Sequence, residues 1–168
     1  MYKEGLEAVI APTVRSLKAA ISTYELQGGT ANIFINDDGL QLINEATRQA
    51  RIDFYADNMI GWTARPPHGL DGFVRKGKFK KASNMNYGLM LSNQIEDLLA
   101  EVDRSGPAWT NSDEAEAYKS CLQQVLASHD GRAWIDGNIR IGDYILLGEY
   151  KCKIKVMLTM FNLFDSRF

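Results

Sequence analysis

Short β-type runs that alternate with longer helical segments constrain the fold of this 168-residue chain most strongly. The helical segments show apolar residues at three- and four-residue steps or begin on capping residues, which predicts amphipathic helices. They cover residues 7–26, 40–55, 82–102 and 112–128. The β-type runs, each closed by a turn signal or a change of pattern, cover residues 31–36, 59–64 and 143–147. Because strands and helices alternate, we expect an α/β fold with a mainly parallel sheet and helices on its faces.

Length and charge narrow the functions that such a chain can have. The length corresponds to one domain or to a piece of a larger one. There are 19 Lys and Arg residues against 21 Asp and Glu residues, so the chain lacks the overall positive charge typical of nucleic-acid binding. No run reaches the roughly 18 apolar residues of a membrane helix. We therefore expect a soluble, intracellular chain without a transmembrane segment, and nucleic acid is not the favoured partner.

Two adjacent carboxylates follow the first β-type run, in the segment Asn36-Asp37-Asp38-Gly39. In open α/β sheets, ligands bind outside the carboxyl ends of the strands. Neighbouring carboxylates repel each other and favour hydrogen-bond donors or a metal, and a nucleoside supplies donors through its ribose hydroxyls and base N–H groups. The alternative interpretation is a solvated turn that caps the next helix, because Asp, Asn and Gly favour turns.

A basic cluster forms the second candidate site. Residues 75–81 contain five Lys or Arg side chains, and they lead into Ser83, Asn84 and Asn86 at the start of a predicted helix. Cations on a glycine-containing loop, followed by small and amide residues at a helix start, suit an anionic phosphate. The cluster could hold a diphosphate or contact RNA, and it could equally be a solvated basic loop.

Three motifs occur in an order that points to one family. They are Tyr2-Lys3-Glu4, Asn36-Asp37-Asp38-Gly39 and Lys80-Lys81-Ala82-Ser83-Asn84-Met85-Asn86. Together they resemble the donor-binding half of a family 2 glycosyltransferase, and the match is greatest to the fungal cellulose-synthase-like branch. The resemblance covers residues 1–147. It implies an incomplete GT-A fold, which is a Rossmann-like, mainly parallel sheet with flanking helices.

The resemblance also implies roles for individual residues. Tyr2 and Glu4 would flank the nucleotide base, and Asp37 or Asp38 would hold the uridine. The wall around the base and diphosphate would be formed by Arg65, Lys81, Asn84 and Asn86. The full-length parent would be an inverting, membrane-embedded polysaccharide synthase that uses a UDP-sugar with Mg²⁺ or Mn²⁺.

Several family features are missing from this chain. The Asp-x-Asp metal motif should follow the strand at 143–147, where the sequence continues Gly148-Glu149-Tyr150. The catalytic-base carboxylate and the acceptor-side motif are also absent. We therefore expect no catalytic residue, no metal held by this chain alone, no transferase activity and only weak UDP-sugar binding. No segment precedes Tyr2 to form the family's first strand, so we also expect an exposed sheet edge.

Residues 148–168 have no counterpart in the family. Because Gly148-Glu149-Tyr150 can be encoded with the intron donor sequence GTGAGT, our hypothesis is a translated retained intron without an evolved function. A different class of function also stays open. In it, the chain is a non-catalytic α/β module that binds RNA or acidic partners through residues 75–81, with Phe73 and Phe79 interleaved.

Overall fold

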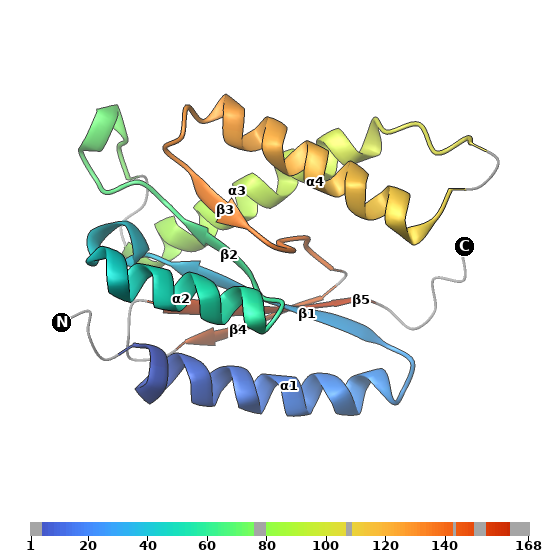
Figure 1. Cartoon of the computed structure of the whole chain (residues 1–168), viewed down its shortest axis with the longest axis horizontal. Coiled ribbons are helices and arrows are strands. Elements are labelled where there is room, and N and C mark those ends of the chain that lie inside the picture. Colours follow the sequence, from blue (N-terminus) through green and yellow to red (C-terminus); the bar gives the residue numbers. More distant parts are fainter. Residues whose placement is uncertain (1–4, 76–79, 107–108, 143, 150–153, 162–168) are drawn as a thin grey trace.

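The computed structural model describes residues 5–75, 80–106, 109–142, 144–149 and 154–161 (Figure 1). The principal helices are α1 (Ala11–Glu25), α2 (Glu45–Asp57), α3 (Lys80–Ala100) and α4 (Asn111–Ser128). A π-helical turn, Leu6–Ile10, leads into α1, and 3-10 turns cover Leu40–Leu42 and Leu70–Gly72. The strands are β1 (Thr30–Asp37), β2 (Gly61–Ala64), β3 (Trp134–Asp136), β4 (Tyr144–Glu149) and β5 (Ile154–Phe161).

The strands form one mixed sheet in the order β3-β2-β1-β5-β4. Only β1 and β2 pair in parallel, whereas β3 pairs antiparallel with β2, and β5 pairs antiparallel with both β1 and β4. The α/β class is confirmed, but the expectation of a mainly parallel sheet is wrong. One reason is that only residues 150–153 separate β4 from β5, and a parallel pair needs a crossover of about a dozen residues.

β5 occupies an inner position of the sheet. Its register with β1 runs from the pair Thr30 and Phe161 to the pair Asp37 and Ile154. β1 has β2 on one side and β5 on the other, so the strand that follows α1 presents no unpaired edge. Since β4 and β1 both run antiparallel to β5, they point in the same direction.

Helices cover both faces of the sheet (Figure 1). Ile33 and Ile35 of β1 pack into a core with α1 and α2, whereas Phe34, between them, packs into a second core with α3 and α4. Successive side chains of a strand point to opposite faces of the sheet, so the side chains of β1 pack alternately into the two cores. This arrangement explains why residues 33–37 are all buried.

Two glycines allow close packing around β1 and β2. A Cβ added at Gly61 would overlap the backbone carbonyl of Asn138, and one added at Gly88 of α3 would overlap the side chain of Asn36. Without these Cβ atoms, α3 lies close against the carboxyl end of β1. The packing thereby brings the start of α3 to the edge where β1 and β2 end.

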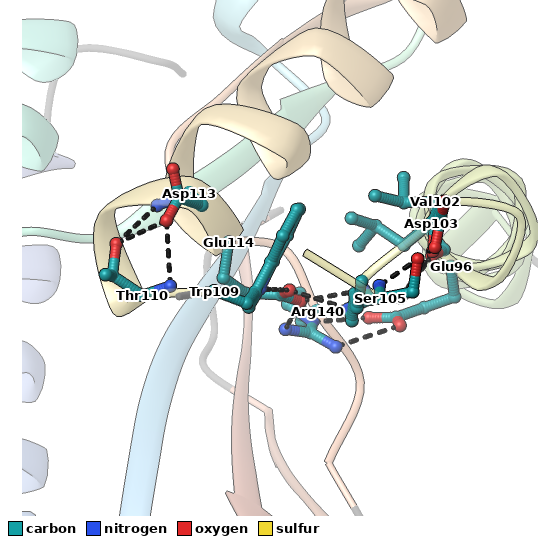
Figure 2. A network of polar contacts seen from close by, with 11 residues as sticks. Glu96, Val102, Asp103, Ser105, Trp109, Thr110, Asp113, Glu114 and Arg140 are labelled. Carbon is teal, nitrogen blue, oxygen red and sulfur yellow. Dashed lines mark hydrogen bonds and ion pairs between the residues drawn. The ribbon is translucent and has the colours of Figure 1, made fainter. Parts of the chain in front are cut away.

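A polar network joins α3, α4 and the segment after β3 (Figure 2). Arg140 donates to Glu96 of α3 at 2.8 Å and lies 3.6 Å from Glu114 of α4. Glu114 also accepts two hydrogen bonds from Arg104, at 2.9 and 3.0 Å. Thr110 begins α4 with a capping box closed by Asp113, which satisfies N–H groups that lack helical partners.

This network predicts a specific loss of stability in acid. The hydrogen bond from Arg104, more than any other interaction, holds the pKa of Glu114 below its usual value of 4.5. A carboxylate with a lowered folded-state pKa stabilises the fold above its unfolded pKa and loses that contribution as the pH falls through the folded value. We expect the melting temperatures of the wild type and of Glu114→Gln to differ most near pH 7 and to converge below about pH 4.5. Glu116→Gln, an exposed change on the same helix, is the control and should differ little from wild type throughout. A constant difference for Glu114→Gln across this range would contradict the assignment.

Candidate functional site

The carboxyl ends of β1 and β2 meet at one edge of the sheet, together with the start of α3. The parallel register pairs Asn36 with Thr63, and the Thr63 hydroxyl donates to Asn36 Oδ1 at 3.1 Å. Asn84 of α3 donates from Nδ2 to the backbone carbonyl of Asn36, also at 3.1 Å. These buried contacts hold the three elements in register just before the chain leaves β1 at Asp38 and β2 at Arg65.

Asp37 is enclosed on the side of the sheet that faces α2. Arg51 donates from Nη1 to both carboxylate oxygens, at 2.9 and 3.1 Å, and the Tyr55 hydroxyl donates at 3.0 Å. The backbone N–H of Gly39 donates to Oδ1 at 3.1 Å. Four bonds use the accepting capacity of the carboxylate, and Asp37 is only 1% exposed. Its contacts therefore tie α2 to the end of β1.

Asp38 lies nearer the surface and pairs with Arg65. Arg65 donates from Nε to Asp38 Oδ1, and the two side chains are 5% and 13% exposed, respectively. This ion pair joins the turn after β1 to the turn after β2. Of the two adjacent carboxylates, Asp38 is the one that retains contact with solvent.

Two polar atoms at this edge of the sheet are buried without a hydrogen bond to any residue that the structure describes. They are Nη1 of Arg65 and Oδ1 of Asn84. More than nine in ten buried backbone groups and most buried side-chain polar atoms are hydrogen-bonded in folded proteins, and a water, an ion or a ligand is one explanation for an exception. Arg65 Nη1 is a cationic donor and Asn84 Oδ1 is a neutral acceptor. A ligand at this edge could therefore both accept and donate a hydrogen bond.

The structure brings together four of the predicted site residues, Asp37, Asp38, Arg65 and Asn84. Asn86 is exposed and lines a separate cavity. Tyr2, Glu4 and the side chain of Lys81 lie outside the described residues, so their roles stay predictions.

Arg51 and Tyr55 are structural partners that sequence reasoning missed. They lie four residues apart, which places them on one face of α2. An arginine and a tyrosine at this spacing in a predicted helix are the sequence signal that could have identified them as partners of a carboxylate.

The basic cluster can be placed only at its start. Arg75 is half-buried, and its backbone N–H donates to Nδ1 of His68 at 3.1 Å. Residues 76–79 and the side chains of residues 80–81 lie outside the described part of the chain. The alternative role of this cluster in binding RNA or acidic partners therefore stays a prediction.

Among the described residues, no group of three or more His, Cys, Asp or Glu side chains is arranged to hold a metal ion. Within the same part of the chain, no helix is both long enough and apolar enough to cross a membrane. No family model matches the chain, and no curated protein or solved structure shows a significant similarity to it.

Proposed function

We propose that this chain is the donor-binding part of a glycosyltransferase 2-like domain, and that it binds the nucleotide of a UDP-sugar where β1 and β2 end. The observation that carries the proposal is the Asp38–Arg65 pair, which keeps contact with solvent, at the same edge as two buried unpartnered atoms, Arg65 Nη1 and Asn84 Oδ1. These groups lie at the carboxyl edge of neighbouring parallel strands, where open α/β sheets bind ligands.

A uridine nucleotide supplies a partner for each of these groups. Arg65 Nη1 would donate to a base carbonyl or a phosphate oxygen, an interaction that a guanidinium makes strongly. Asn84 Oδ1 would accept from a base N–H or a ribose hydroxyl. Asp38 would accept from a ribose hydroxyl through its second carboxylate oxygen, because the pair with Arg65 uses Oδ1.

The proposal concerns binding of the donor and does not include transfer by this chain. Inverting transfer requires a carboxylate that deprotonates the acceptor hydroxyl. Both carboxylates at the edge are held by arginines, Asp37 by Arg51 and Asp38 by Arg65. In this proposal, the catalytic base and the Mg²⁺ or Mn²⁺ site belong to a full-length, membrane-embedded polysaccharide synthase.

Calorimetric titration with UDP tests the proposal. We expect weak but saturable binding by the wild type and an affinity about tenfold lower for Arg65→Lys. The planar guanidinium can pair with Asp38 through Nε and donate to the ligand through Nη1, whereas the single ammonium of lysine cannot make both interactions in this geometry. Arg15→Lys, an exposed change on α1, should bind as the wild type does. UDP binding that is equal in all three proteins, or absent from a folded wild type, would contradict the proposal.

A further inference from the structure

A second cavity, of about 460 Å³, lies between the loop that follows β2, the start of α3 and the segment that follows α4. Its apolar wall includes Phe73, Val74 and Met90, and its polar lining includes Ser83, Tyr87 and Arg132. The volume falls within the range of small-molecule sites, which is about 300–1,000 Å³. The combination of an apolar wall with a few polar groups is also typical of such sites.

Two largely buried residues, Ser83 and Tyr87, bring hydroxyl groups to the lining of this cavity. Ser83 is 6% exposed and Tyr87 is 8% exposed, and within the described part of the chain neither hydroxyl has a hydrogen-bond partner. The hydroxyl of a buried tyrosine usually finds a partner. The ring of Tyr87 meets that of Phe73 edge to face, with centroids 5.7 Å apart, and that of His129 at 6.3 Å. The ring is therefore held in place, while its hydroxyl remains available to a ligand.

The charge of the lining favours an anion. Arg132 is a cation, and no Asp or Glu is among the lining residues that the structure describes. Within the described part of the chain, the Arg132 side chain is 41% exposed, forms an ion pair with Asp130 at 3.3 Å and donates to the carbonyl of His129 at 3.3 Å. Burial raises the pKa of Tyr87 to about 12, against an opposing effect of Arg132, so the Tyr87 hydroxyl is a donor at neutral pH.

We propose that this cavity binds a carboxylate carried on an aromatic ring system. The carboxylate would accept hydrogen bonds from Arg132 and from the Tyr87 hydroxyl, and the rings would pack against Phe73 and Met90. The proposal does not depend on nucleotide binding, because it rests on residues outside the Asp38–Arg65 pair. Ser83 lines the cavity and Asn84, the next residue of α3, belongs to the proposed nucleotide site, so the two sites are adjacent along α3.

Three matched probes test the charge preference on the wild-type chain: 2-naphthoate, neutral 2-naphthylmethanol and cationic 2-naphthylmethylamine. We expect naphthoate to bind at least about tenfold more tightly than either analogue, since a charge-assisted hydrogen bond strengthens only the anion's binding. Equal affinities, or no binding of naphthoate, would overturn the proposal. Displacement of naphthoate by UDP would also overturn the proposal that the cavity is separate from the nucleotide site.

Two variants locate the binding site. Arg132→Gln should weaken naphthoate binding about tenfold, and Tyr87→Phe should weaken it several-fold while leaving the melting temperature unchanged, because the lost hydroxyl has no partner within the described fold. Arg15→Gln, on the opposite face of the sheet, serves as the control and should bind as the wild type does. Unchanged affinity in both cavity variants would show that the probe binds elsewhere.

Discussion

Deleting residues 150–168 is expected to abolish cooperative folding, because the deletion removes β5. β5 pairs with β1 over eight residues and with β4 over six, so its loss opens the edge of β1 and leaves β4 without its described partner. Each hydrogen bond contributes about 0.5–1.5 kcal/mol net. The total stability of a domain is only about 5–15 kcal/mol, so losing two ladders is enough to unfold it. Circular dichroism during thermal denaturation would measure the loss.

A chain that ends at Phe161 is the matched control, because it retains β5. We expect this control to unfold cooperatively and the chain that ends at Glu149 to aggregate or to melt without a transition. Equal stability of the two truncated chains would contradict the role given to β5. It would instead support the hypothesis that residues 148–168 are a translated intron without a structural contribution.

Replacing Asp37 with alanine is expected to lower the free energy of unfolding by about 3–5 kcal/mol, the cost of breaking a buried ion pair. The Asp37 and Arg51 side chains are 0% and 4% exposed, so the substitution leaves a buried guanidinium without its two carboxylate bonds. It also removes the acceptor of the Tyr55 hydroxyl. Urea denaturation followed by fluorescence would measure the loss.

Two further variants make this prediction specific. Asp53→Ala removes an exposed carboxylate of α2 that accepts a bond from Gln49, and it should change stability by less than about 0.5 kcal/mol. The double change Asp37→Leu with Arg51→Met should recover much of the loss, because it replaces the pair with apolar side chains. A loss for Asp37→Ala no larger than that for Asp53→Ala would show that the pair does not stabilise the fold.

The helices were predictable because their periodicity is local. The predicted ranges 82–102 and 112–128 match α3 (Lys80–Ala100) and α4 (Asn111–Ser128) closely. The relative direction of strands is not a local property, because it depends on which strands pair. The prediction of a mainly parallel sheet was wrong for this reason. β3 has only three residues, too few for a periodic pattern. β5 was missed because its apolar run was interpreted as a tail through the family resemblance rather than as a strand.

The candidate site was predictable in composition and not in its internal contacts. The sequence places Asp38, Arg65 and Asn84 at the ends of predicted elements, and the fold brings them to one edge. Whether Asp37 or Asp38 contacts solvent depends on which face of α2 packs against β1, and this orientation is tertiary. The buried bonds of Asp37 with Arg51 and Tyr55 settle that orientation in the structure.

The central claim is that the edge formed by β1, β2 and the start of α3 binds a uridine nucleotide. Nuclear magnetic resonance of the side-chain N–H groups of Arg65 and Asn84, during titration with UDP, tests it most directly. The account predicts that both signals shift and saturate together with a single dissociation constant, while the Arg132 signal in the second cavity stays unchanged. Unchanged Arg65 and Asn84 signals at saturating UDP, or shifts confined to Arg132, would contradict it.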